Sequence, residues 1–94
     1  MNADAIKAKL GKLDIADQAA IANWDVTTGR DSTGDPAVWV FVVVKDEHLA
    51  AFEPTWHETR WRIKAAVAEL APEAFPYVRL QLESEIAHPA VANG

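Results

Sequence analysis

Apolar residues recur at helical spacing near the N-terminus and alternate with polar residues further along, so the pattern itself divides the chain into elements. Helical spacing over residues 3–13 predicts a first helix, with Asn2 or Asp4 available to cap its start. The end of this helix stays open, because Gly11 weakens a helix whereas the apolar residues after it can continue one as far as Ile21. The apolar stripe consists of Ile6, Leu10 and Leu13.

Two strands are predicted next, on either side of a polar loop. Residues 24–28 alternate with a period of two, which is typical of a half-buried strand. After the loop GRDSTGDP, the unbroken apolar run Val38–Val44 predicts a strand that is buried on both faces and therefore lies at the centre of a sheet. The two strands are expected to form an antiparallel hairpin, with a connection longer than the tight two-residue type.

A second helix is predicted from Thr55 onward. Thr55 and Glu58 fit the capping box, in which the two side chains satisfy each other's free backbone amides. Pro54 disfavours helix at Glu53, and Pro72 stops the helix after Ala71. The predicted apolar stripe consists of Trp56, Ile63, Val67 and Leu70.

The last element is a strand over residues 76–86, which alternates cleanly between apolar and polar side chains. The whole chain is expected to be one domain over residues 1–88, followed by a tail over residues 89–94 that frays. One face of the strand carries Val78, Leu80 and Leu82, and the other carries Arg79, Gln81 and Glu83.

These elements predict an α+β fold in the order α-β-β-α-β. The second helix acts as a right-handed crossover, which makes the third strand parallel to the second and gives a mixed three-stranded sheet in the order 1-2-3. Both helices are expected to cover one face of the sheet, as a two-layer sandwich. The other face of the sheet is then open.

The open face is the main candidate for function. The valine side of the central strand suits packing under helices, which leaves Trp39 and Phe41 on the open face among polar neighbours. Such a stripe is explained by a partner protein or second copy, by cover from the chain's own termini, or by single-stranded nucleic acid stacking on the rings. Trp61 on the second helix is expected either to be half-buried or to anchor a partner. The candidate partner-binding residues are Trp39, Phe41, Val43, Arg79, Gln81 and Trp61.

The loop DSTGD offers carboxylates and hydroxyls, which are also the groups that turns use. It lacks the ligand spacing of an EF-hand. A structural turn is favoured, and a ligand or partner loop is the alternative. The loop candidates are Asp31, Ser32, Thr33 and Asp35.

The remaining chemistry in the sequence is sparse. His57, Glu85 and His88 are the outside candidates for metal ligation, but they lack a recognised spacing, and solvated polar residues explain them as well. The sequence has no P-loop, no GxGxxG and no nucleophile elbow. We therefore expect a protein that is not an enzyme and that needs no cofactor.

Composition narrows the classes of partner. The chain has 94 residues, a formal net charge of −5 and no cysteine. The acidic balance disfavours binding to nucleic acid or an anionic membrane, and the absence of cysteine excludes disulfides and thiolate chemistry. The charged N-terminal segment lacks the apolar region of a signal peptide, so a cytoplasmic location is expected.

Residues 24–86 resemble a group of small bacterial proteins that have no assigned activity. The likeness rests on the hairpin D-S-T-G-D-P-A, the apolar strand after it, and the strand P-Y-V-R-L-Q-L-E-S-E. The order α-β-β-α-β is also similar to the cytoplasmic domains of cation-diffusion-facilitator transporters, which dimerise and bind metal. That second likeness is one of topology alone, and the chain lacks a matching set of His and Asp ligands.

The sequence thus favours a protein–protein interaction or homodimerisation domain that makes contact through its open sheet face. A metal-linked regulatory domain is the alternative. A single-stranded nucleic-acid binder and a small enzyme rank lower.

Overall fold

The computed structural model describes residues 2–15 and 18–87. Two long elements of helix and a three-stranded sheet make up most of the chain, with short helical turns between them. The helices are α1 (Ala3–Gly11), α2 (Leu49–Phe52), α3 (Trp56–Leu70) and α4 (Glu83–Ala87). The strands are β1 (Ile21–Arg30), β2 (Pro36–Val44) and β3 (Phe75–Leu82), and 3₁₀ turns span Gln18–Ala20, Asp46–His48 and Glu53–Thr55.

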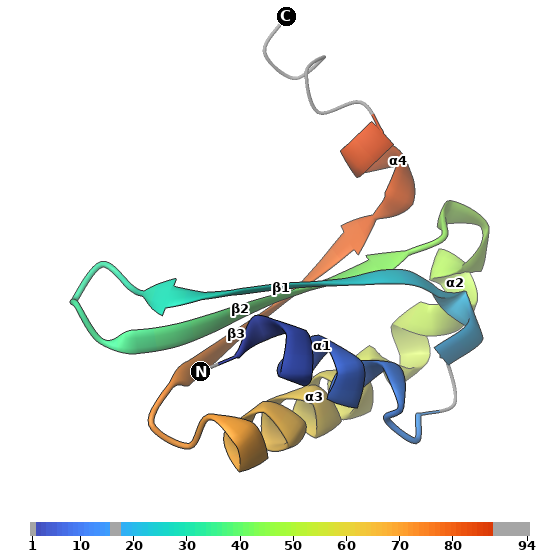
Figure 1. Ribbon diagram of the computed structural model, residues 1–94. Coiled ribbons are helices and arrows are strands. Elements are labelled where there is room, and N and C mark those ends of the chain that lie inside the picture. Colours follow the sequence, from blue (N-terminus) through green and yellow to red (C-terminus); the bar gives the residue numbers. More distant parts are fainter. Residues whose placement is uncertain (1, 16–17, 88–94) are drawn as a thin grey trace, which may run out of the picture.

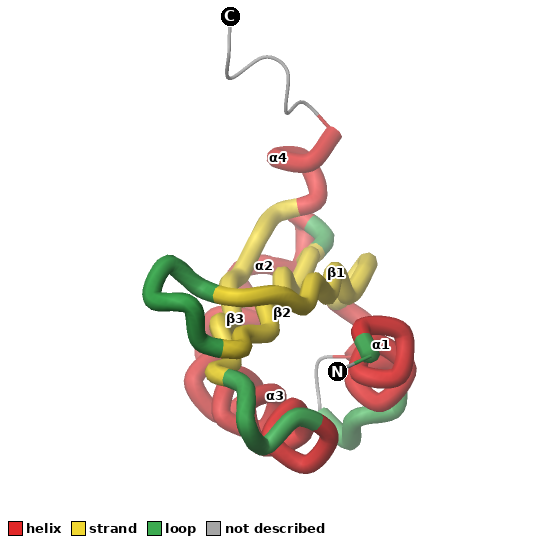
Figure 2. Tube along the Cα trace, turned by 60° about the vertical axis from the view of Figure 1, so that its left-hand side comes forward, coloured by secondary structure: helices red, strands yellow, loops and turns green. Residues whose placement is uncertain are grey.

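The sheet has the order β1-β2-β3, with β1 antiparallel and β3 parallel to the central β2. Helices α1 and α3 lie together on one side of it (Figures 1 and 2). The predicted two-layer α+β sandwich is therefore confirmed. The helical turns between β2 and α3, and the short α4 after β3, are additions that the sequence pattern did not predict.

The core lies between the helices and the valine side of β2. Four valines of this strand are fully buried there, at positions 38, 40, 42 and 44. They pack with Ile6 and Leu10 of α1 and with Ile63 and Val67 of α3. Burying one such side chain contributes about 1.5–3 kcal/mol, so this face supplies much of the stability of a chain of this size.

Helix α1 is shorter than its longest predicted extent. Asn2 is the cap, because its Oδ1 accepts from the backbone N–H of Ala5 at 3.2 Å. The helix ends at Gly11, and Ile21 already belongs to β1. The side-chain amide of Gln18 donates to the carbonyls of Leu10 (3.0 Å) and Leu13 (2.9 Å), which satisfies them without a further helical turn.

The predicted capping box at the start of α3 is wrong. Glu53 is helical rather than outside the helix, and the backbone N–H of Trp56 bonds to its carbonyl. Because the chain enters α3 through helical turns, the first amide of the helix has a backbone partner, and the Thr55 side chain makes no cap hydrogen bond. The Thr55 hydroxyl instead donates to the Phe52 carbonyl at 3.0 Å, and Glu58 pairs with Arg62 at 3.3 Å.

The ends of α3 and of β3 also differ from the prediction. Leu70 was expected in the buried stripe of α3 but is the last residue of the helix and is 44% exposed. The third strand ends at Leu82 rather than at residue 86, and Glu83 begins α4. There the Ser84 N–H and hydroxyl donate to the Asp46 carboxylate, and the Leu82 N–H donates to Glu85, so side chains satisfy the amides that a continued strand would leave free.

Helix α4 projects from the end of β3, away from α1 and α3 (Figure 1). None of the helices in the described part of the chain is long and apolar enough to cross a membrane. The predicted tail over residues 89–94 lies outside the described residues.

Candidate functional site

The face of the sheet opposite α1 and α3 is the candidate functional surface, and we call it the open face. Trp39 and Phe41 of β2 lie on it and are partly exposed, whereas the valines of the other side are fully buried. Asp25 and Thr27 of β1 flank the two rings on one side and are exposed. The helices thus cover the valine side and leave the aromatic side open, as the pattern of β2 predicted.

Aromatic rings gather on the open face across two strands. Trp39 stacks on Tyr77 of β3, with ring centroids 5.7 Å apart and planes 13° apart. The ring of Phe75 contacts that of Tyr77, with centroids 4.7 Å apart, and Phe75 is 54% exposed. Stacked pairs of this kind contribute about 0.5–1.5 kcal/mol beyond their buried area. The open face therefore holds three rings in contact, Phe75, Tyr77 and Trp39. Together with Phe41, which lies on the same side of β2 as Trp39, we call them the aromatic cluster.

Phe75 and Tyr77 were not among the site residues predicted from the sequence. The strand pattern did indicate them, because residues two apart on a strand share a face, and both lie an even number of residues before Arg79. Gly29 of β1 supports the cluster from the other side. A Cβ atom there would lie 3.4 Å from the Trp39 ring, so the indole is held against the glycine backbone as well as against Tyr77.

Charges border the aromatic cluster on both edges. The pairing register places Asp25 opposite Phe41, and Phe41 opposite Arg79. Asp25 and Arg79 are both exposed. We call a row of residues paired across the three strands a rung. One rung of the open face therefore carries an acid on β1, a phenyl ring on β2 and a base on β3.

Val43 is a correction to the predicted contact surface. It lies on the same side of β2 as Trp39 and Phe41, but it is only 2% exposed. Its side chain is short and lies between two paired strands, beside a register irregularity of β1 between Ile21 and Asn23 that places an extra residue next to it. The longer rings of Trp39 and Phe41 project beyond their neighbours, and Gln81 on β3 is half-buried.

The DSTGD loop is built as a turn around one carboxylate. Oδ1 of Asp31 accepts from the N–H of Thr33 (2.9 Å), the N–H of Asp35 (3.1 Å) and the Thr33 hydroxyl (2.6 Å). Gly34 has a φ of +85°, which L-residues rarely adopt, and its N–H donates to the Asp31 carbonyl. The Arg30 guanidinium closes the loop on the Gly34 carbonyl at 2.8 Å, while Ser32 is exposed.

The second oxygen of Asp31 joins this loop to the open face. Tyr77 donates its hydroxyl hydrogen to Oδ2 of Asp31 at 3.2 Å. The hydrogen bond from the Thr33 hydroxyl, with those from Asp35, Thr33 and Tyr77, holds the pKa of Asp31 below its usual value. Partial burial and the negative charge of Asp31 raise the pKa of Tyr77. The loop therefore positions a ring of the aromatic cluster, a link that spacing alone did not predict.

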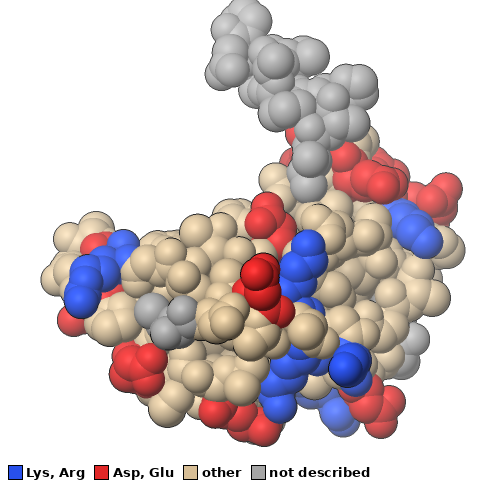
Figure 3. Space-filling model, in the orientation of Figure 1, with Lys and Arg blue, Asp and Glu red and all other residues tan. Residues whose placement is uncertain are grey.

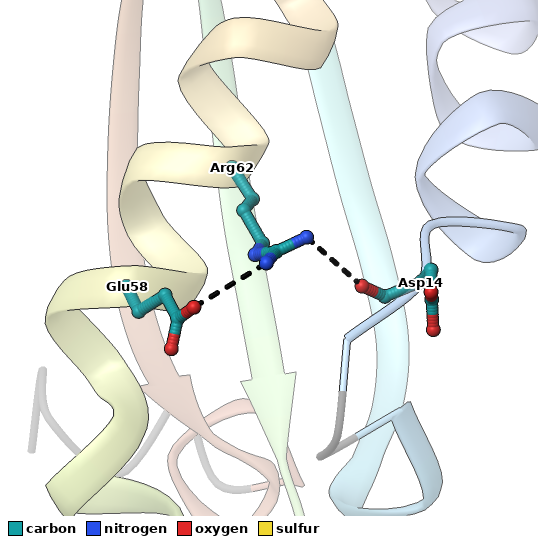
Figure 4. A network of polar contacts seen from close by, with 3 residues as sticks. All are labelled: Asp14, Glu58 and Arg62. Carbon is teal, nitrogen blue, oxygen red and sulfur yellow. Dashed lines mark hydrogen bonds and ion pairs between the residues drawn. The ribbon is translucent and has the colours of Figure 1, made fainter.

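A second surface lies on the outer side of α3. Trp61 is 72% exposed there, so the half-buried alternative for it is wrong. It lines a groove of about 770 Å³ whose walls also include Leu13, Ala65 and Ala66. Arg62 borders this groove and donates to the Asp14 carbonyl at 3.4 Å and to Glu58 at 3.3 Å (Figure 4). The contact with Asp14 joins α3 to the segment after α1, whereas the contact with Glu58 lies within α3.

The candidate metal ligands are not brought together where the structure describes them. His57 lines the α3 groove, and Glu85 accepts from the Leu82 N–H at 2.8 Å. His88 lies outside the described residues. Within residues 2–15 and 18–87 no group of three His, Asp or Glu side chains is arranged to hold a metal ion. The metal-linked alternative stays a prediction.

On the face drawn in Figure 3, several basic side chains gather near the middle of the view, acidic side chains lie mostly around them, and most of the surface is neither. A scan of protein-family models, a search of curated proteins and a search of solved structures give no match for this chain.

Proposed function

We propose that the chain is a protein–protein contact domain and that it binds its partner through the open face. The observation that carries this proposal is the aromatic cluster of Phe75, Tyr77, Trp39 and Phe41, which lies on the side of the sheet opposite α1 and α3. Exposed apolar patches with a polar border mark contact surfaces, and Trp and Tyr are frequent anchors in them.

Pre-organisation of the rings supports the same function. Trp39 is held between Tyr77 and the backbone of Gly29, and Tyr77 is held by its hydrogen bond to Asp31. Rings that are fixed before binding lose little conformational entropy when a partner covers them. The cluster is therefore suited to binding without rearrangement.

Charge favours a protein partner over a nucleic acid. The chain carries a net charge of −5, and Arg79 on the open face is balanced by Asp25 on the same rung. Single-stranded nucleic-acid sites combine stacking rings with a positively charged groove. Stacking on Trp39 is also partly used within the chain, because Tyr77 already occupies one face of the indole.

Site-specific photo-cross-linking tests this function directly. A photoreactive amino acid in place of Phe41 is expected to join the chain to a protein, either a second copy or another chain, in cells of the source organism. The matched control has the same residue in place of Ala68, which is exposed on α3. Equal adducts from both positions, or none from position 41, would contradict the proposal.

The double variant Trp39→Ser, Phe41→Ser completes this experiment. Both side chains lie outside the helix-covered core, so the variant is expected to stay folded, as judged by far-UV circular dichroism. Its protein adducts, captured from a photoreactive residue at the neighbouring Thr27 position, are expected to disappear. Adducts that persist in the folded double variant would show that the rings are not the contact.

A further inference from the structure

The charges of the open face have an order that is complementary to itself. Across one rung they read acid, ring, base, from Asp25 through Phe41 to Arg79. Within residues 2–15 and 18–87, neither Asp25 nor Arg79 takes part in an ion pair. Because neighbouring strands lie about 4.8 Å apart, the two charges flank Phe41 at roughly equal distances on either side.

Two identical sheets that pack face to face with their strands aligned can be related by a two-fold axis in two orientations. An axis that runs across the strands sets Asp25 over Asp25 and Arg79 over Arg79, which brings like charges together. An axis that runs along β2 exchanges the positions of β1 and β3. It sets each Asp25 over Arg79 of the partner subunit, so opposite charges meet twice.

We propose that the partner of the open face is a second copy of this chain, packed about a two-fold axis parallel to β2. Trp39 and Phe41 lie near the axis and meet their own counterparts, and two Asp25–Arg79 pairs close the interface on its edges. This inference rests on the proposed function, because it uses the same surface. The axis also places both α4 helices at one end of the dimer, on opposite sides of the axis, because β3 lies on opposite sides of it in the two copies.

The size of the face indicates how stable the dimer is. Three strands about 4.8 Å apart and eight rungs of about 3.3 Å give a footprint on the order of 400 Å² for each copy. A standard interface buries about 800 Å² on each partner, so a weak, reversible dimer is expected rather than an obligate one. Sedimentation velocity over a concentration series measures this equilibrium.

Charge variants test which groups face each other. Asp25→Arg and Arg79→Asp are each expected to weaken self-association at least tenfold, because each variant sets like charges over one another. An equimolar mixture of the two variants is expected to recover association, since both contacts are then Arg over Asp. Glu47→Arg makes the same change in net charge as Asp25→Arg at an exposed position off the open face, and it is expected to leave association unchanged.

Cysteine cross-linking tests the orientation of the two copies. The chain has no native cysteine, so a single introduced thiol reports on one position. With a short bis-maleimide reagent, Asp25→Cys and Arg79→Cys are each expected to remain uncross-linked alone and to form a heterodimer when mixed. Efficient dimers of Asp25→Cys alone would place the axis across the strands and overturn this orientation, whereas the proposed function would stand.

The remaining outcomes separate the two proposals. A wild-type chain that stays monomeric over the whole concentration series overturns the homodimer, while adducts of position 41 with a different protein still support the proposed function. A dimer that survives both Trp39→Ser, Phe41→Ser and the charge variants overturns the inference and points to pairing along a sheet edge. If position 41 then gives no adduct, the proposed function fails as well.

Discussion

The two faces of β2 show how one strand serves two purposes. From Val38 to Val44, the side that faces the helices carries only valines, all fully buried, and it packs with Ile63 and Val67 of α3. The other side carries Trp39 and Phe41, which remain partly exposed and lie beside charged neighbours. Short branched side chains fill a close-packed layer, whereas large rings beside charges suit a surface to which a partner binds reversibly. The comparison predicts that stability depends on the first face and association on the second.

The largest expected effect comes from the helix layer over the valine side. Ile63→Ala is expected to lower the free energy of unfolding by about 2–5 kcal/mol, because Ile63 is fully buried and its removal leaves a cavity. Trp61→Ala, on the same helix but mostly exposed, is expected to change it by less than about 0.5 kcal/mol. Urea denaturation followed by circular dichroism measures both, and equal losses in the two variants would contradict the claim that stability depends on the layer packed against the valine side.

An intermediate effect is expected from a polar atom placed on the buried side of β2. Val40→Thr keeps the shape of the side chain but adds a hydroxyl with no access to water, which costs about 1–3 kcal/mol of stability. The reverse change, Thr27→Val, lies on the exposed side of β1 and is expected to be within about 0.5 kcal/mol of the wild type. A Val40→Thr chain as stable as wild type in thermal unfolding would show that this layer is not tightly packed.

The smallest effect concerns the loop that positions Tyr77 on the open face. Asp31 has a pKa below its usual value of about 3.9, chiefly because the Thr33 hydroxyl donates to it. The stabilisation from Asp31 is therefore fully present above that usual value and is lost as the pH falls through the lower pKa of the folded state. The contacts of Tyr77 with the loop are expected to loosen in the same acidic range.

Thr33→Val removes the main donor to Asp31. The pKa of Asp31 is then expected to rise toward its usual value, so the loop loosens at a higher pH than in the wild type. NMR titration of the Asp31 carboxyl carbon and the Asp35 amide follows the change. Ser32→Ala, at an exposed position of the same loop, is the control. An unchanged Asp31 titration in Thr33→Val would rule out the hydroxyl as the cause.

Periodicity along the chain was sufficient to predict the elements that depend on local pattern. The apolar run Val38–Val44 identified the central strand, and its alternation with large rings identified which side the helices leave open. Local pattern was less reliable where tertiary contacts replace local ones. The segment before α3 is helical despite Pro54, and β3 gives way to α4 because Asp46, remote in sequence, accepts hydrogen bonds from Ser84.

The candidate site shows the same division between sequence and structure. Sequence alone determined that Trp39 and Phe41 share one side of a central strand, because side chains alternate with a fixed period of two. Only the tertiary structure placed Asp25, Phe41 and Arg79 on one rung and joined Asp31 to Tyr77, because strand register depends on loop geometry and on the path of the crossover helix. It also left Trp61 exposed, since the packing angle of α3 on the sheet decides which helix residues reach the core.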